Sequence, residues 1–517
     1  MSSSFSSNFI KLNKKLFFSK KNLNKDECIF VEFNKWSCCH ISISNCLLAL
    51  KKKYNCKVVA YPENGLDHFL KEKTFVNKTK FFLGKNLGIS NFGVYKSFST
   101  NEFLDIKNNK KCIRKSQKTF NKTINKIKSK NDLLKLKIEN ILIGDLIYDS
   151  FLKQYNKETI NIYSKIFKNF LKISINYFYF WLEQFELKKI KSVISSQSVY
   201  LSSLPIRIGI SKKCICLVSN PERLYRLSEK NLYSDKEHMN FKILKNKIDN
   251  NILSKGIRVS EIRIKKRFTG KVGQDLSYLS KTAYGSMTGK RLLRNNKKFK
   301  VLIAPHSFCD APHQLGRHLF PDYFEWLKFI ILNASKKYDW YIKCHPNFVD
   351  YFDNTLSVVK KMIKLNTSIK YLNPLISHNQ LIKEGINAVI TCHGTIGSEY
   401  PYFNLLVINA SNSNPHIKYN FNIHPRSINS LKKILNNLDK QKINIKKKEV
   451  LEYYFMKNIY FSNNWLFENF EELIKYCGGY KNIYKNKCYD FWLKNWNKDK
   501  QNKLTNSINK FISSKNY

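Results

Sequence analysis

The sequence has 517 residues, more than a single hydrophobic core usually holds, so two domains are expected. Hydrophobic residues make up 43% of the chain and aromatic residues 14%, which excludes a disordered protein. The 91 lysines and arginines outnumber the 38 acidic residues and give a net charge of +53. Lysine is spread through nearly every segment without a localised arginine-rich patch, so we interpret the charge as compositional and expect no nucleic-acid partner.

The 13 cysteines follow no metal-binding or disulfide pattern, because no pair has CxxC spacing. Reduced, mostly buried thiols in a cytoplasmic protein are therefore expected. The serine-rich N-terminus is interrupted by lysines, unlike a signal peptide. The most apolar window, 167–185, carries Lys168, Lys172 and Glu183, which is too much charge for a membrane span. We expect a cytoplasmic protein that at most lies on an anionic membrane surface.

Residues 1–25 are predicted to be a flexible basic leader. A strand at 28–33, a helix at 41–54 and a second strand at 57–61 then give a β-α-β opening, which is typical of a Rossmann-like unit. The opening lacks a GxGxxG sequence, so nothing in it supports dinucleotide binding. Residues 230–297 are polar and weakly patterned and are interpreted as an extended connection.

Asp145 and Asp149 fall in a turn within the first half of the chain. Two interpretations stay open: they form a paired-carboxylate site, or they serve as ordinary helix N-caps.

A second α/β unit is predicted to begin with a strand at 301–304. Another apolar run, 340–343, is followed closely by His345 and Pro346. A third, 387–391, leads into a glycine-containing turn and a short helix, with a parallel strand at 405–408. Polar strand ends in one open sheet converge on one crevice, and a helix that begins near Thr395 would offer free N–H groups to an anion there.

Histidine is concentrated in this second half, which holds eight of the 11. They are His306, His313, His318, His345, His378, His393, His416 and His424. No HExxH or HxH grouping occurs, and the spacing matches no known zinc-ligand pattern. We therefore expect no metal.

The crevice predicted at these strand ends suits a phosphate. Lys343 and His345 alternate along a strand end, so their side chains face the same side and suit a phosphate leaving group. In the turn after 387–391, Gly394 would let the backbone approach the phosphate closely. Thr395 and Ser398 would add hydroxyl donors, and the Glu399 carboxylate would accept hydrogen bonds from ribose hydroxyls. In the alternative interpretation, Thr395 is a plain N-cap and Glu399 a surface residue.

His306 and Asp310 follow the strand at 301–304 and are candidates for a general base toward an acceptor hydroxyl. The alternative is a hydrogen-bonded turn without a chemical role.

Two segments carry a family resemblance: Lys343–Cys344–His345–Pro346, and the later Thr391–Cys392–His393–Gly394–Thr395–Ile396–Gly397–Ser398–Glu399. Together they resemble the second domain of capsule and surface-polysaccharide biosynthesis proteins. That group includes the Kdo transferases of capsule assembly and is more distantly similar to teichoic-acid glycerophosphotransferases and bacterial sialyltransferases. The stretch 144–149 is also similar to this group.

The resemblance implies an α/β fold of GT-B type, with two Rossmann-like doubly wound domains facing a cleft, no metal and no cofactor. The expected parts are a leader at 1–25, an acceptor domain at 26–275, a linker at 276–295, a nucleotide-donor domain at 296–480 and C-terminal helices at 481–517.

By the same resemblance, His345 contacts the donor phosphate, and Thr395, Ser398 and Glu399 lie at the nucleotide. Cys392 and His393 depart from the family, which often has small residues there. His393 and Gly394 are included among the residues expected to bind the nucleotide.

The expected function is transfer of a sugar from a nucleotide-sugar donor to a surface or capsular polysaccharide or its lipid-linked precursor, in the cytoplasm or at the inner face of the membrane. The catalytic candidates are Asp310, His306 and His345. One alternative is a polyol-phosphate transferase of the CDP-glycerol type. Another is a non-catalytic basic protein that binds nucleic acid or an anionic membrane.

Overall fold

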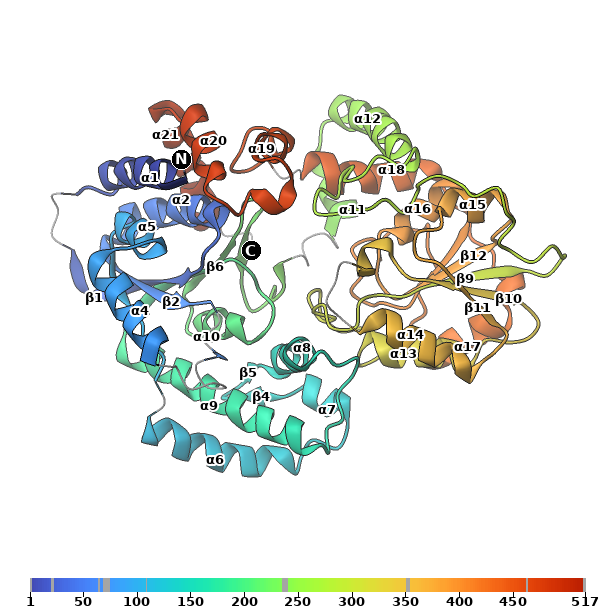
Figure 1. Cartoon of the computed structure of the whole chain (residues 1–517), viewed down its shortest axis with the longest axis horizontal. Coiled ribbons are helices and arrows are strands. Elements are labelled where there is room, and N and C mark those ends of the chain that lie inside the picture. Colours follow the sequence, from blue (N-terminus) through green and yellow to red (C-terminus); the bar gives the residue numbers. More distant parts are fainter. Residues whose placement is uncertain are drawn as a thin grey trace. The chain divides into compact units, whose positions relative to one another are not determined.

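The computed structural model describes residues 2–19, 23–63, 66–67, 75–107, 109–234, 240–349, 354–461 and 464–514. The chain divides into two compact units, which are described separately (Figure 1). The first comprises Met1–Tyr148, Asn161–Ser234 and Asn463–Tyr517, and the second Asp149–Ile160 and Asp235–Ser462. The C-terminal residues thus return to the first unit, whereas residues 235–295, expected in the first domain and a linker, belong to the second.

The first unit is built on a six-stranded sheet in the order β3-β2-β1-β6-β7-β8. Its strands are β1 (Asn24–Phe33), β2 (Cys56–Pro62), β3 (Thr100–Phe103), β6 (Lys189–Ser195), β7 (Ile215–Ser219) and β8 (Leu224–Leu227). All pairs are parallel except β7 with β8. The order reverses between β1 and β6, as in a doubly wound Rossmann-like sheet. A separate antiparallel pair joins β4 (Lys137–Ile138) to β5 (Ile141–Leu142).

Residues of β1 alternate between two buried layers, as the pleat of a strand dictates. Ile29 and Val31 belong to the same hydrophobic cluster as residues of α2 (Ser37–Tyr54). Phe30 instead packs against Trp181 of α9 (Lys165–Leu187), with ring centroids 6.1 Å apart. The other helices of this unit are α4 (Phe75–Leu87), α5 (Asn91–Ser97), α6 (Lys110–Ile124), α7 (Lys130–Leu134), α10 (Leu204–Ser211), α19 (Phe470–Cys477), α20 (Lys487–Asn495) and α21 (Lys498–Ser513). α8 (Gly144–Tyr155) crosses the boundary between the units.

The prediction of a flexible leader is wrong, because Ser2–Leu16 form a helix, α1, that packs on the first unit. Phe9 and Phe17 are only 1% and 7% exposed, and buried Asn13 lies between them at helical spacing. The Phe9 ring stacks on Tyr489 of α20, with centroids 4.5 Å apart. The buried residues at every fourth position therefore hold this helix in place. The lysines and serines between them are the reason that the sequence predicted a flexible segment.

The second unit is built on a five-stranded sheet in the order β11-β10-β9-β12-β13. Its strands are β9 (Lys300–Ala304), β10 (Asp339–Lys343), β11 (Ile369–Leu372), β12 (Ala388–Thr391) and β13 (Leu406–Asn409), and every pair is parallel. Ile303 of β9 pairs with Ile342 on one side and Ile390 on the other. The strand order reverses between β9 and β12, so this sheet too is doubly wound.

The helices of the second unit are α11 (Phe241–Leu244), α12 (Asn250–Phe268), α13 (Tyr323–Leu332), α14 (Thr355–Met362), α15 (His378–Lys383), α16 (Ile396–Tyr402), α17 (Ile428–Asn436) and α18 (Lys447–Phe455). α12 packs against α18 (Figure 1). A Cβ atom at Gly256 of α12 would lie 2.1 Å from the Phe455 ring, so glycine permits this close approach. The interpretation of 230–297 as an extended connection is therefore wrong, because α11 and α12 lie in this range.

The predicted α/β fold class, with two Rossmann-like doubly wound sheets and C-terminal helices, is confirmed. In the described part of the chain, no helix is both long and apolar enough to cross a bilayer.

Replacing Phe9 with alanine tests the packing of α1. The lost contacts and the cavity should reduce the free energy of unfolding by about 3–5 kcal/mol. The matched control is Phe18→Ala, because Phe18 is 73% exposed; its effect should stay within about 0.5 kcal/mol. Urea denaturation compares the two, and equal effects would show that α1 does not pack on the first unit.

Candidate functional site

The candidate site lies at the carboxyl edge of the second sheet. His306 follows β9, His345 follows β10 and His393 follows β12. β9 and β12 flank the point where the strand order reverses, which is where open α/β sheets bind their ligands. The sheet therefore brings together three loops, each with a predicted site residue.

His306 joins two of these loops. Its Nε2 accepts a hydrogen bond from the backbone N–H of His393 at 2.8 Å and lies 3.2 Å from the Thr391 hydroxyl. A Cβ atom at Gly394 would lie 3.2 Å from His306 Cε1, so the turn approaches the ring closely. Burial lowers the pKa of His306 to about 3, which keeps the ring neutral with its proton on Nδ1. Its basic nitrogen is thus already engaged.

Asp310, the other candidate base, is exposed in the turn after His306. Among the described residues, no hydrogen bond joins Asp310 to His306. The two candidates therefore do not form a coupled pair in this structure.

Lys343 is the last residue of β10 and is only 2% exposed. Its Nζ donates to Nε2 of His378 at 3.3 Å. Within the described residues, no carboxylate lies at ion-pair distance from this nitrogen. Burial lowers the pKa of Lys343 to about 7, although the more distant Glu399 carboxylate acts in the opposite direction. The sheet edge thus holds a buried amine whose positive charge no protein anion neutralises.

His345 presents an N–H donor beside this lysine. Its Nδ1 accepts the backbone N–H of Asn347 at 3.2 Å, which leaves the proton of the neutral ring on Nε2. Burial, and then the charge of Lys343, lowers the pKa of His345 to about 4, so the ring is neutral at pH 7. Nε2 has no partner in the part of the chain that the structure describes. A neutral imidazole whose N–H is free to donate suits a phosphate oxygen.

The turn after β12 leaves backbone donors free. The amides of Gly394, Thr395 and Ile396 have no acceptor among the residues described. Thr395 stands at the N-cap position of α16, as in the alternative interpretation, but its side chain makes no capping hydrogen bond. The Ser398 hydroxyl donates to the Thr395 carbonyl at 3.0 Å, so it is already committed within the turn.

Glu399 is only 5% exposed, so its interpretation as a surface residue is wrong. Arg267 of α12 donates to Oε1 from Nε at 2.9 Å and from Nη2 at 2.7 Å, and the Tyr284 hydroxyl donates to Oε2 at 2.8 Å. Burial is the largest single effect and raises the pKa of Glu399, but the Arg267 charge and the hydrogen bonds from Tyr284, Thr395 and Arg267 together hold the pKa below its usual value. This ion pair fixes the turn to α12.

Three residues of the site were missed from the sequence: Arg267, Tyr284 and His378. Arg267 and Tyr284 lie in the weakly patterned segment 230–297, and Arg267 is 132 positions from Glu399. His378 was noted only as one of many histidines. Nothing in the local sequence of these residues indicates their partners.

A group of buried polar side chains next to the site lacks partners. Both side-chain atoms of Asn409 and both ring nitrogens of His416 are unpaired in the described structure, as is Nε2 of His393. Asn409 and His416 are 0% and 2% exposed. A Cβ at Gly397 would lie 2.7 Å from His416 Nε2, so this group borders the first turn of α16. Such groups cost about 1–3 kcal/mol each when they stay unpaired.

Both interpretations of Asp145 and Asp149 are wrong. Asp145 accepts hydrogen bonds from Arg207 at 2.7 Å and from Tyr233 at 2.9 Å, within the first unit. Asp149 instead binds Nδ1 of His313 at 2.6 Å, within the second unit. The two carboxylates are thus tied to different partners, and neither acts as an N-cap.

The clustered histidines do not share a metal-binding arrangement. In the described ranges, no group of three or more His, Cys, Asp or Glu side chains has a geometry that could hold an ion.

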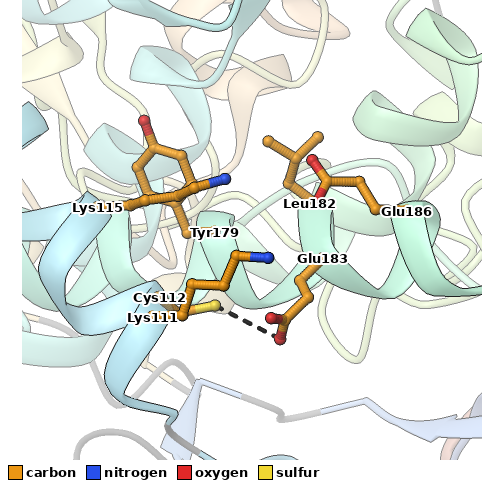
Figure 2. Close-up of a pocket in the computed structure, with 7 residues that line it drawn as sticks. All are labelled: Lys111, Cys112, Lys115, Tyr179, Leu182, Glu183 and Glu186. Carbon is orange, nitrogen blue, oxygen red and sulfur yellow. Dashed lines mark hydrogen bonds between the residues drawn. The ribbon is translucent and has the colours of Figure 1, made fainter.

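Figure 2 shows a pocket in the first unit, between α6 and α9. Its lining is Lys111, Cys112, Lys115, Tyr179, Leu182, Glu183 and Glu186. The Cys112 thiol donates to Glu183 Oε2 at 3.6 Å. Lysines and glutamates are balanced in this pocket, and it contains none of the predicted site residues.

No protein-family model matches the sequence, and no curated protein sequence matches it. Similar solved structures include KpsC of Thermosulfurimonas dismutans, a beta Kdo 2,4 transferase, with 12% identity and a TM-score of 0.33 over 52% of this chain and 79% of that chain. A UDP-GlcNAc 2-epimerase from Neisseria meningitidis, bound to UDP-GlcNAc, has 10% identity and a TM-score of 0.23 over 90% and 98% of the two chains. A glycosyltransferase from Rickettsia africae has 11% identity and a TM-score of 0.23 over 92% and 100%. These similarities are too low to assign an activity, so function is argued from the site.

Replacing Glu399 with glutamine tests the buried ion pair. At pH 7 the variant should lose about 3–5 kcal/mol of unfolding free energy, because it leaves the Arg267 charge buried and unpaired. The folded pKa of Glu399 lies below its ordinary 4.5. The stabilisation is therefore complete above about pH 4.5 and is lost as the pH falls through the folded pKa. Denaturation from pH 3 to 8 should show a difference that shrinks at low pH.

The matched control for this measurement is Glu468→Gln, since the Glu468 side chain is 78% exposed and pairs with Lys500, whose side chain is also exposed. It should behave like the wild type at every pH. A Glu399→Gln variant that behaves like this control would contradict the assigned role of the ion pair.

Proposed function

We propose that the chain is a metal-independent glycosyltransferase whose second unit holds the phosphate of a nucleotide-sugar donor. One observation carries the proposal: within the described residues, Lys343 is buried at the carboxyl edge of the sheet without a carboxylate partner, next to the free Nε2–H of His345. An unpaired buried charge is costly. A bound phosphate would offset that cost, whereas a purely structural lysine has no need of this position.

The same groups suit sugar transfer. As the bond between the sugar and the phosphate breaks, negative charge builds on the leaving oxygens. Donors that are already in place stabilise this charge without reorganising. We assign this task to Lys343 and His345, with the free amides of Gly394 and Thr395 on the same leaving group. His393, Ser398 and Glu399 complete the proposed nucleotide site, and Glu399 acts there by fixing the turn through Arg267.

For the acceptor hydroxyl we propose Asp310 as the general base. Its side chain is exposed, and among the described residues no hydrogen bond joins it to His306. His306, whose Nε2 is held by the His393 amide, then serves to position the turn after β12.

The resemblance of 343–346 and 391–399 to capsule and surface-polysaccharide proteins supports sugar transfer as the reaction. On that basis we propose a surface or capsular glycan, or its lipid-linked precursor, as the acceptor, and the cytoplasmic face of the membrane as the place of action. Polyol-phosphate transfer would use the same phosphate site and is distinguished by the nucleotide and the group transferred.

The His345→Ala variant tests the phosphate assignment. Wild-type protein should be stabilised against thermal unfolding by at least one of CMP, CDP, UDP and GDP. The variant should keep nearly the same melting temperature, lose that nucleotide-induced shift and lose about 10²–10³ in turnover. His345→Gln, which keeps a side-chain N–H donor, should retain part of the shift. An unchanged shift in His345→Ala would remove His345 from the site.

The Asp310→Asn variant tests the base. Release of nucleotide from the donor sugar should fall by about 10²–10⁴, as expected on loss of general base catalysis. The nucleotide-induced thermal shift should remain, because Asp310 does not contact the phosphate in this proposal. Normal turnover in Asp310→Asn would exclude it as the base.

A further inference from the structure

We propose that Lys343 binds the donor phosphate together with a proton, and that His378 is the positioning residue that holds the lysine ready to take it. The inference rests on the proposed function of the same site. It follows from a buried row of three hydrogen-bonded side chains, Lys343, His378 and Tyr400, in which His378 and Tyr400 have no role in the sugar transfer proposed above.

The hydrogen bonds along Lys343, His378 and Tyr400 all run in one direction. Lys343 Nζ lies 3.3 Å from His378 Nε2, and His378 Nδ1 lies 2.7 Å from the Tyr400 hydroxyl. An ammonium only donates, so Nε2 must accept and Nδ1 must carry the ring proton toward Tyr400. His378 and Tyr400 are 6% and 0% exposed, which fixes the ring between α15 and α16.

A neutral imidazole is an unusual partner for a buried lysine. A carboxylate in its place would keep the ammonium permanently charged and would compete with a phosphate for it. The imidazole orients the amine without neutralising it. Burial holds the pKa of His378 well below its usual value, and the neighbouring Lys343, His345 and Arg267 lower it further, so the ring itself stays uncharged.

The charged groups that face Lys343 from the neighbouring elements nearly cancel. Arg267 of α12 is paired with Glu399 of α16, and Tyr284 donates to that carboxylate. Neutral His345 follows on the same chain segment. Cys344 and Glu399 favour the charged amine, yet burial prevails and sets the pKa of Lys343 at about 7.

A bound phosphate adds negative charge beside this amine and raises its pKa, so binding above pH 7 takes up a proton. Affinity should be constant below the pKa of the free site. Above it, affinity should fall by about tenfold per pH unit until the pKa of the complex is reached. Arginine at position 343 would remain charged throughout and bind without proton uptake.

The test is calorimetric titration of the full chain with UDP and with CMP at pH 8, in HEPES and in Tris, whose ionisation enthalpies differ. The wild type should take up close to one proton per nucleotide, and its affinity should fall from pH 7 to pH 9. Lys343→Arg should bind with little proton uptake and a flat pH profile, and Lys343→Met should bind at least tenfold more weakly at pH 7. His378→Leu should shift the pH midpoint of binding downward, which a merely structural histidine would not do.

Two outcomes distinguish a failure of this inference from a failure of the proposed function. Wild-type binding without proton uptake, or equal uptake by Lys343→Arg, overturns the inference and leaves the nucleotide site intact. No binding of either nucleotide between pH 6 and 9 overturns both. If the variants fail to fold, the pH profile of the wild type alone still decides the matter, because a flat profile contradicts a proton-linked lysine.

Discussion

A buried amine at the end of a parallel strand, with no carboxylate counter-ion among the described residues, is the constraint on which the site of the second unit depends. The backbone of Lys343 is fixed in this position, because it ends β10, an interior strand of the five-stranded sheet. Its side chain cannot pair with Glu399, because Arg267 and Tyr284 already hold that carboxylate. The ion pair between Arg267 and Glu399 thus keeps a nearby anion from neutralising the lysine. The amine can then respond to an anion from outside the chain.

The strand order places the other groups around this charge. β9 lies between β10 and β12, so the loops after all three strands open on the same edge. His306 ties two of these loops together through the His393 amide, and Gly394 lets the backbone pass close to that ring. A neutral His345 with a free N–H then completes this set of donors. Each of these contacts lies within a single unit of the protein.

The strands and the polar residues at their ends could be predicted from the sequence because both depend on local pattern. The apolar runs at 301–304, 340–343 and 387–391 are each followed two residues later by a histidine, and the structure places these histidines at one edge. Arg267 could not be predicted as a partner of Glu399, since α12 buries Gly256 and Ser260 and so lacks a strong apolar period. The packing of α1 was missed for a similar reason, because its buried stripe includes Asn13. Asp145 and Asp149 share one helix and yet serve different units, which no spacing rule can reveal.

The most direct test of the account is a crystal structure of the full chain with the nucleotide that stabilises it. The account predicts a phosphate oxygen within hydrogen-bond distance of both Lys343 Nζ and His345 Nε2, with the amides of Gly394 and Thr395 facing the same phosphate. It also predicts that the Arg267–Glu399 pair stays intact. A nucleotide whose phosphates lie away from these two side chains would contradict the central claim, and so would a Lys343 that has turned to pair with Glu399.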